Sequence, residues 1–287
     1  MATPAPLLAV DAPSLLYRAF FALPGSITDG EGRPVNALLG CTNLILQAVE
    51  RYAPRAVILC FGAEAATYRV ELHDGYHADR PEMPADLAHQ WADAPAFFAT
   101  FGWPALDAGE LEADDLLGSL AQAEVAAGGR ALLFTGDRDM FQCVGDSVAV
   151  LFPVSGAKDG PQLVDAAGVL TRYGIVPEQV PDFIALRGDP SDGIPGAKGI
   201  GEKTARDLLR EHGTLDTAIA NALRERPRVR AALREQADEL RAFRQMATLQ
   251  PVAVKRPADQ PTDFGAAAVA AEQRGMRRLA ERLRAMA

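Results

Sequence analysis

Short apolar runs alternate with stretches of helical periodicity along the first half of the chain. The apolar runs have the length of buried strands and end at polar or turn-forming residues, at positions 7–10, 56–61, 131–135 and 147–152. The stretches between them repeat large apolar residues with a helical period, at positions 14–23, 37–52, 85–101 and 111–129. Strands that alternate with helices predict an α/β fold, in which a mainly parallel, twisted sheet carries helices on both faces.

The pattern changes after Pro153. Residues 161–250 are predicted to form a series of short helices without a further strand. Within this series, four glycines in nine residues open the segment 193–209, which continues directly into an amphipathic helix. We expect one more helix, on the surface, over residues 266–286.

Composition narrows the class of protein. The 287 residues are 48% apolar and 23% charged, which is ordinary for a soluble globular chain. No apolar run approaches the roughly 20 residues that span a bilayer, and the N-terminus lacks the basic and apolar regions of a signal peptide. Three scattered cysteines, Cys41, Cys60 and Cys143, have no metal-type spacing. We therefore expect a cytoplasmic protein without a membrane partner.

The net charge of −9 is distributed unevenly. Residues 1–195 carry 11 Lys or Arg against 26 Asp or Glu, whereas residues 196–256 carry 13 basic against 8 acidic side chains. An acidic part followed by a basic part is compatible with a metal site beside a phosphate-binding surface.

Acidic residues recur where a parallel sheet would bring them together. Ligands of such sheets bind outside the carboxyl ends of the strands. Candidate positions end the first strand, follow the third strand, begin the helix that starts near residue 112, and precede the glycine-rich segment. They are Asp11, Glu112, Asp114, Asp115, Asp137, Asp139, Asp189 and Asp192.

Eight carboxylates at one sheet edge would repel one another unless cations were bound. An oxygen-only ligand set favours Mg²⁺ or Mn²⁺ over zinc. Two or more such ions would suit phosphodiester hydrolysis, because they activate a water and stabilise the leaving oxygen. The ordinary alternative for residues 110–115 is a solvated helix start, where carboxylates are favoured by the helix dipole.

The glycine-rich segment is the candidate nucleic-acid grip. Small residues let a backbone approach a ligand closely, and N–H groups at a helix start favour phosphate. Lys198, Lys203 and Arg206 add positive charge there. A tight turn between helices is the alternative, but its place directly after Asp189 and Asp192 favours a duplex grip beside a metal site.

Four motifs carry a resemblance to a known family: "LLAVDAPSLLYRAFFAL", "GELEADDLLGSLA", "TGDRDMFQCV" and "RGDPSDGIPGAKGIGEKTARDLL". From about Leu7 to about Val254 the chain resembles the 5′-nuclease superfamily, which includes the 5′ to 3′ exonuclease domain of bacterial DNA polymerase I and the flap endonucleases. The resemblance implies a PIN-like nuclease domain at 1–170 with a helical arch near 67–105, a helix-hairpin-helix-type (H3TH) DNA-binding domain at 171–255, and a helical tail at 256–287. It also implies a K⁺ ion at the 196–204 hairpin.

Site residues follow from the same resemblance. It assigns the eight carboxylates to metal binding, with Asp11, Glu112, Asp114 and Asp115 at the first ion and the other four at the second. It implies that Arg18, Arg69 and Arg80 orient the phosphate and stabilise developing charge. The implied DNA-binding residues are Tyr76, His77, Lys198, Gly199, Gly201, Lys203 and Thr204.

Two positions depart from the family. Gly62 ends the strand "AVILCFG" where the family usually has an aspartate, so one first-site carboxylate is missing; Glu64 lies two residues further on. His77 stands where the family usually has lysine, and histidine is only partly charged at physiological pH.

The resemblance implies a structure-specific 5′ to 3′ exonuclease and 5′-flap endonuclease of DNA replication and repair. Its expected partners are DNA with 5′ flaps, nicks or recessed 5′ ends, and it is expected to be coupled functionally to a DNA polymerase and a ligase. No polymerase region follows, so we expect a stand-alone nuclease. Because of Gly62 and His77, the alternative is a structure-specific DNA-binding protein with weakened catalysis.

Overall fold

Six strands form one sheet in the computed structural model, which describes residues 4–154, 156 and 160–287. Their order is β3-β2-β1-β4-β5-β6. The strands are β1 (Leu7–Asp11), β2 (Ala56–Phe61), β3 (Ala105–Asp107), β4 (Ala131–Phe134), β5 (Val148–Phe152) and β6 (Gln162–Val164). Strands β1 to β5 are parallel, and β6 runs antiparallel to β5. The predicted mainly parallel sheet is confirmed.

Both faces of the central strands are buried. In β1, Leu7 and Ala9 pack into one apolar cluster, while Leu8 and Val10 pack into the cluster on the opposite face. Alternate side chains of a strand point to opposite faces, so a strand covered on both sides is apolar throughout. This is why the strands appear in the sequence as continuous apolar runs.

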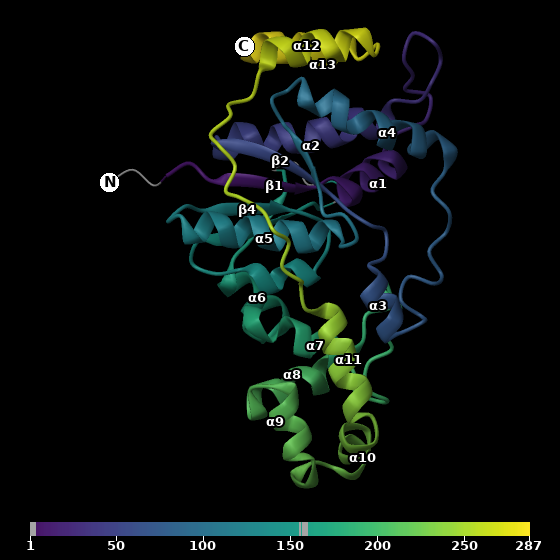
Figure 1. Ribbon diagram of the computed structural model, residues 1–287, viewed down its shortest axis with the longest axis vertical. Coiled ribbons are helices and arrows are strands. Elements are labelled where there is room, and N and C mark those ends of the chain that lie inside the picture. The colour runs from purple at the N-terminus through teal and green to yellow at the C-terminus, as the bar shows by residue number, and fades with distance from the viewer. Residues whose placement is uncertain (1–3, 155, 157–159) are drawn as a thin grey trace.

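Helices cover the sheet on both faces (Figure 1). Helices α1, α2, α4, α12 and α13 contribute to one apolar cluster, whereas α5 and the helices from α6 to α11 contribute to the other. Their bounds are α1 (Ala12–Ala22), α2 (Asn36–Tyr52), α3 (Thr67–Leu72), α4 (Ala85–Ala99), α5 (Ala113–Ala126), α6 (Ala166–Tyr173), α7 (Val180–Arg187), α8 (Glu202–His212), α9 (Leu215–Ala220), α10 (Pro227–Glu235), α11 (Ala237–Ala247), α12 (Phe264–Gln273) and α13 (Arg277–Met286), with short 3₁₀ turns η1 (Asp139–Cys143), η2 (Pro177–Gln179) and η3 (Ala222–Arg224).

Two short strands were missed by the sequence pattern. Strand β3 has three residues and none of them is buried, while β6 has three residues and buries only Val164. Both lie at edges of the sheet, where a strand has too few apolar residues to produce a recognisable run. The prediction that no strand follows Pro153 is therefore wrong.

The C-terminal segment differs from the single surface helix predicted over 266–286. It forms two helices, α12 and α13, whose Ala267, Ala271, Leu279 and Leu283 are buried in the cluster shared with α1, α2 and α4. Arg274 donates to both carboxylate oxygens of Asp93 in α4, at 2.7 and 2.8 Å. Alanine allows helices to approach closely, and this burial is not evident from its weak hydrophobicity.

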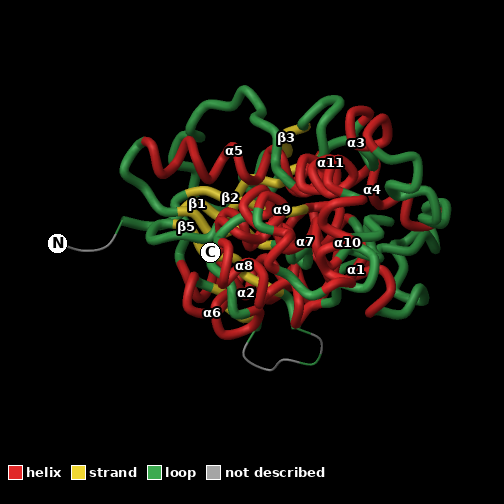
Figure 2. The backbone as a smooth tube through the Cα atoms, turned by 90° about the horizontal axis from the view of Figure 1, so that it is seen from below, coloured by secondary structure: helices red, strands yellow, loops and turns green. Residues whose placement is uncertain are grey.

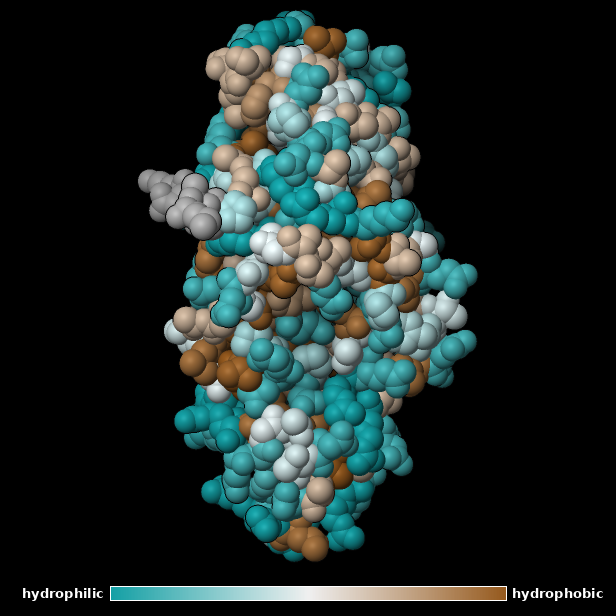
Figure 3. Space-filling model, turned by 60° about the vertical axis from the view of Figure 1, so that its left-hand side comes forward, coloured by the Kyte–Doolittle hydropathy of each residue, from teal (hydrophilic) through white to brown (hydrophobic). Residues whose placement is uncertain are grey.

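Helices α1, α3 and α10 lie on the same side of the molecule (Figures 1 and 2). The end of the molecule formed by α8 to α11 is mainly hydrophilic on the face shown in Figure 3. Within the described residues, no helix has both the length and the apolar character needed to cross a membrane.

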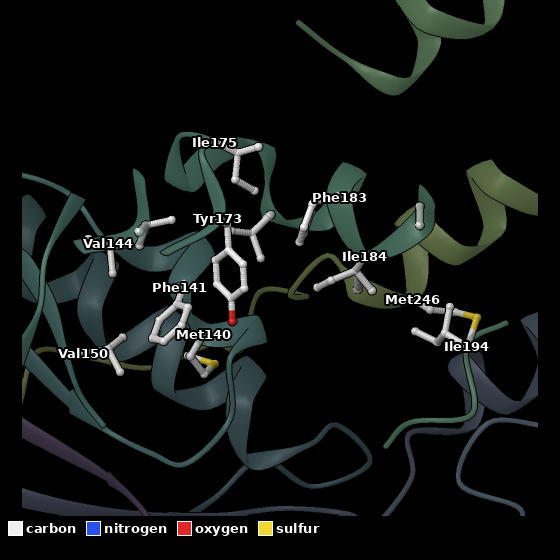
Figure 4. Close-up of a cluster of buried hydrophobic side chains, with 14 of the residues drawn as sticks. Met140, Phe141, Val144, Val150, Tyr173, Ile175, Phe183, Ile184, Ile194 and Met246 are labelled. Carbon is white, nitrogen blue, oxygen red and sulfur yellow. The ribbon is translucent and has the colours of Figure 1, made fainter. Parts of the chain in front are cut away.

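A continuous apolar core joins the sheet to the helical region. It runs from Met140 and Phe141 of η1, through Phe183 and Ile184 of α7, to Met246 of α11 (Figure 4). This packing fixes the loop that follows α7 relative to the turn that follows β4. The division into domains at 1–170, 171–255 and 256–287 stays a prediction.

Candidate active site

The predicted ligands Asp11 and Asp137 lie where the strand order of the sheet reverses, between β1 and β4. Asp11 is the last residue of β1 and caps α1: its Oδ1 accepts from the Ser14 amide at 3.0 Å. Its Oδ2 accepts from the Thr135 hydroxyl at 2.6 Å, and that hydroxyl oxygen accepts from the Asp137 amide at 2.9 Å. Thr135, which the sequence prediction missed, therefore fixes both carboxylate-bearing turns. Its position between β4 and Asp137 was the available signal.

Glu112 and Asp115 are paired with a buried arginine side chain. Arg69 donates to both oxygens of Asp115, at 3.0 and 2.9 Å, and its Nη1 lies 2.9 Å from Glu112 Oε1. Glu112 also accepts from the Tyr76 hydroxyl at 3.0 Å, while Asp115 accepts from the amides of Glu112 and Gln250. These partners contact both oxygens of each carboxylate. The structure thus places two predicted ligands of the first ion in a buried ion pair.

The other carboxylates repel one another. Burial is the main cause that raises the pKa of Asp137 to about 7, and the charge of Asp192 is the next. Burial likewise raises the pKa values of Asp114 and Asp139, with the charge of Asp137 next in both cases. Burial also raises the pKa of Asp11. Such coupling needs groups close together in a poorly solvated place. The carboxylates gathered in this way are Asp11, Asp114, Asp137, Asp139, Asp189 and Asp192, and the charge of Glu112 also raises the pKa of Asp114 although Glu112 is paired with Arg69.

The loop after α7 brings Asp189 and Asp192 to this group. Asp189 accepts from the Ser191 amide at 2.9 Å and also from the Ser191 hydroxyl, and Arg187 donates to it at 3.1 Å. Asp192 Oδ1 lies 3.2 Å from His77 Nε2. Ser191 and Arg187 are positioning residues that the sequence prediction missed.

These carboxylates gather without closing around one point. In the part of the chain that the structure describes, the group of three ligand atoms within 4.8 Å of one another is instead Glu211, His212 and Glu225. There, His212 Nε2 lies 2.8 Å from Glu225 Oε1 at the end of α8. Exposed Arg224 and Arg226 flank Glu225 in the sequence. We assign this group to a hydrogen bond between His212 and Glu225 at the end of the helix.

The three predicted phosphate-orienting arginines have different surroundings. Arg69 is only 3% exposed, and its contacts are the internal ones described above. Arg80 is half-exposed and its Nη2 lies 3.4 Å from Asp192 Oδ1, next to the carboxylate group. Arg18 is half-buried in α1, two turns after Asp11. Arg80 and Arg18 are thus accessible to a phosphate, whereas Arg69 is not.

Tyr76 and His77 belong to the segment after α3 and contact carboxylates of the site, Glu112 and Asp192 respectively. Tyr76 is buried, and burial followed by the charge of Glu112 raises the pKa of its hydroxyl. The His77 ring stacks on the Tyr76 ring with centroids 3.9 Å apart, and its Nδ1 donates to the Glu64 carbonyl oxygen at 2.9 Å. Glu64, two residues after Gly62, is exposed.

The predicted hairpin residues form a separate surface. Lys198, Gly199, Gly201 and Lys203 are exposed, and Thr204 is half-buried. The turn is held by the Ala197 amide, which donates to the Leu186 carbonyl oxygen at 2.9 Å, and by the Ile200 amide, which donates to Ala197. The hairpin is therefore anchored to α7, which also leads to Asp189.

Gly62 is closely packed against the start of α5. A Cβ atom on Gly62 would lie 2.5 Å from the Leu111 carbonyl oxygen and 2.7 Å from the Ala113 amide nitrogen. Real Cβ atoms do not approach backbone atoms so closely. The missing first-site carboxylate therefore coincides with a backbone contact that leaves no space for a side chain.

We expect Gly62→Asp to destabilise the protein by about 1–3 kcal/mol, because the added side chain overpacks this contact. Cleavage at low Mg²⁺ should not increase. Thermal unfolding and a metal titration of cleavage measure the two effects, with Gly62→Ala as a control that adds the Cβ atom without the charge. A Gly62→Asp variant that is as stable as the wild type and cuts faster at low Mg²⁺ would show that α5 can move aside.

Comparisons with known families cover nearly the whole chain. Residues 6–174 match the model of the 5′-3′ exonuclease N-terminal resolvase-like domain, and residues 175–263 match that of the 5′-3′ exonuclease C-terminal SAM fold. The chain is 39% identical over 236 residues to the thermostable DNA polymerase I of Thermus thermophilus, and 37% identical over 229 residues to the DNA polymerase I of Mycobacterium tuberculosis. These matches cover 82% and 79% of this chain but only 28% and 25% of the relatives.

Solved structures share the fold at low identity. A flap endonuclease of bacteriophage T5, in a pseudo-enzyme–product complex with DNA and metal ions, is 18% identical with a TM-score of 0.69, and 98% of each chain is covered. The catalytic core of Rad2 in complex with a DNA substrate is 16% identical with a TM-score of 0.57, covering 97% of this chain and 91% of that one. Another T5 5′-exonuclease structure, with a TM-score of 0.68 and 17% identity over 96% of each chain, contains zinc.

Proposed function

Because this chain belongs to the 5′-3′ exonuclease family, we propose that it is a divalent-metal-dependent, structure-specific 5′ nuclease. It would act as a 5′ to 3′ exonuclease and 5′-flap endonuclease on DNA with 5′ flaps, nicks or recessed 5′ ends. The observation that carries this proposal is the group of mutually repelling carboxylates at the switch point of the sheet.

The residues fit divalent ions of the hard, oxygen-preferring type. The gathered side chains offer carboxylate oxygens only. Burial first, and the charges of neighbouring carboxylates next, raise the pKa values of Asp114 and Asp137, and a bound cation would relieve both costs. We propose Mg²⁺ or Mn²⁺, held by Asp11, Asp114, Asp137, Asp139, Asp189 and Asp192. Bound divalent ions would supply an activated water and stabilise the leaving oxygen.

The surrounding residues orient these groups and the substrate. Thr135 and Ser191 hold Asp11 and Asp189 by hydrogen bonds. The side chain of Arg80, 41% exposed, would bind a substrate phosphate beside Asp192, and Arg18 would do the same from α1. Arg69 has a different role in this proposal, since it neutralises Glu112 and Asp115 and keeps the start of α5 in place.

We also propose that the hairpin at 196–204 holds a K⁺ ion. In the part of the chain that the structure describes, the carbonyl oxygens of residues 198–200 accept no hydrogen bond, so they are available to a cation. The relatives named DNA polymerase I join this type of segment to a longer chain. Functional coupling to a polymerase, and to a ligase that seals the product, is therefore part of the proposal.

Cleavage of a labelled 5′-flap DNA, titrated with Mg²⁺ and separately with Mn²⁺, tests this function. We expect cleavage near the base of the flap with either ion and none in EDTA, while a single strand without a duplex should be cut much more slowly. Replacing K⁺ with Na⁺ at constant ionic strength should weaken duplex binding.

A second function is favoured by one observation. Gly62 carries no carboxylate, and Glu112 and Asp115 are committed to Arg69, so the first ion has only Asp11 and Asp114 of the predicted set. The chain would then bind structured DNA with weak catalysis. Flap binding without cleavage in any Mg²⁺ or Mn²⁺ concentration would establish this alternative.

A further inference from the structure

The last two helices, α12 and α13, lie beyond the two matched family models, which together end at residue 263. They form a C-terminal helix pair at the end of the molecule that also contains α2 and α4 (Figure 1). Their side chains Ala267, Ala271, Leu279 and Leu283 are buried in the apolar cluster to which α1, α2 and α4 contribute. Helix α4 belongs to the segment 67–105 that is predicted to form the arch. The C-terminal helix pair therefore packs against the group of helices that includes the second half of the predicted arch.

One arginine joins this pair to α4. Arg274, directly after α12, donates to both carboxylate oxygens of Asp93 in α4, at 2.7 and 2.8 Å. Its guanidinium also lies over the Phe97 ring, with Cζ 4.8 Å from the centroid. Two charged hydrogen bonds and a ring face together fix the orientation of a guanidinium. On the other side of the pair, Arg282 of α13 donates to Glu50 of α2 at 2.8 Å. The C-terminal helix pair is thus bonded to α4 and to α2.

Helix α4 is in turn bonded to α2 and, through it, to α1. Gln90 of α4 is 1% exposed, and its Oε1 accepts from the amides of Ala37 and Leu38 in the first turn of α2, at 2.7 and 3.2 Å. Its Nε2 donates to Asn36 Oδ1 at 3.1 Å, and Asn36 Nδ2 donates to the Phe20 carbonyl oxygen of α1 at 2.9 Å. Helix α1 is capped by a carboxylate of the site. The position of α4 is therefore linked by buried hydrogen bonds to a helix that begins at the site.

We propose that the C-terminal helix pair, through the bonds between Arg274 and Asp93, keeps α4 folded against α1 and α2 before DNA is bound. Without these bonds α4 would open more often, because an element that loses its contacts opens locally at a lower free energy than the whole protein. Bound DNA would then have to select the ordered form of α4. The part of this proposal that concerns DNA rests on the proposed function, whereas the part that concerns the free protein does not.

Hydrogen exchange of the α4 amides in the DNA-free protein tests the proposal. We expect Arg274→Ala to speed this exchange by about 5- to 30-fold, and Arg274→Lys, which keeps the charge without the two-pronged contact, to speed it less. Asp93→Asn should act like Arg274→Ala, and the double variant should exchange no faster than either single one, since both remove the same contact. Arg284→Ala is the matched control, because this exposed arginine of α13 pairs with Glu272 of α12 inside the C-terminal helix pair. It should leave the exchange of α4 unchanged.

Flap DNA added in EDTA should bring the α4 exchange of Arg274→Ala back to that of the wild type, and cleavage in single turnover at saturating enzyme should match the wild type. Faster exchange of α12 and α13 with α4 unchanged would overturn the proposal, because the pair would then only be docked on α4. An equal increase throughout the protein would also overturn it, since the bonds would then contribute only to overall stability. If the wild type neither binds nor cuts flap DNA while α4 responds as expected, the proposed function fails and the role of the C-terminal helix pair stands.

Discussion

Replacing Asp137 with Asn is expected to lower 5′-flap cleavage by more than about 100-fold, because changes even to outer-shell groups of metal sites cost 10–100-fold. Asp137 is half-buried beside other carboxylates and carries no ion pair with a basic side chain of the described chain, so its charge is available to a divalent ion. Single-turnover cleavage measured at saturating enzyme isolates the chemical step from binding. Duplex affinity in EDTA should be close to that of the wild type.

The pH dependence of stability provides the control for this variant. Burial raises the pKa of Asp137 from 3.8 to about 7, so between these values the folded protein binds the proton that the unfolded chain has lost. The free energy of unfolding of the metal-free protein should therefore fall as pH rises through this window. Asn has no proton that titrates in this range. The free energy of unfolding of the Asp137→Asn variant should therefore fall less with pH, and the variant should be at least as stable as the wild type at pH 8 without metal.

With Mg²⁺ added, the wild type should become more stable than the Asp137→Asn variant. The ion binds the folded wild type and raises its thermal midpoint at pH 8, whereas the variant should gain less. An Asp137→Asn enzyme that cuts flaps at the wild-type rate, with the same gain in midpoint from Mg²⁺, would show that Asp137 is not a metal ligand.

The sequence predicts the sheet well because its central strands are covered on both faces. Leu7 to Val10 are all buried, so burial itself produces the continuous apolar run. The short edge strands β3 and β6 lack this signal. The C-terminal segment was predicted as a surface helix for a related reason. Residues such as Ala267 and Ala271 are buried completely, although alanine is a weak indicator of burial.

The sequence predicts the part of the site that follows from the order of the strands. Asp11 and Asp137 follow adjacent parallel strands, so their proximity follows from the strand order. The partners of Glu112 and Asp115 could not be predicted in this way. Arg69 is 46 residues away from Asp115 in the sequence, and their contact depends on the packing of α3 against α5 and α11. Likewise, the contact between Gly62 and the start of α5 is possible because Gly62 has no Cβ atom, and the sequence does not show that the two backbones approach so closely.

Arg69→Met is expected to be the most destabilising of the substitutions considered, at about 3–5 kcal/mol, because it leaves buried charges without a partner. Burial alone would lower the pKa of Arg69, but the charges of Glu112 and Asp115 outweigh it and the pKa is raised, so this guanidinium stays charged. Its Nε donates to the Met246 carbonyl oxygen at 2.9 Å. One side chain thereby joins α3, the start of α5 and α11, and urea unfolding should report its loss.

The double variant Arg69→Met, Asp115→Asn decides between a structural and a catalytic role. Asn removes one of the uncompensated charges, so the double variant should regain part of the stability lost by Arg69→Met alone. If Arg69 instead contacts the scissile phosphate, as the family resemblance implies, Arg69→Met would stay nearly as stable as the wild type and lose cleavage in single turnover. The buried geometry favours the first result, because a side chain that is 3% exposed and bonded to three internal groups presents little surface to a substrate.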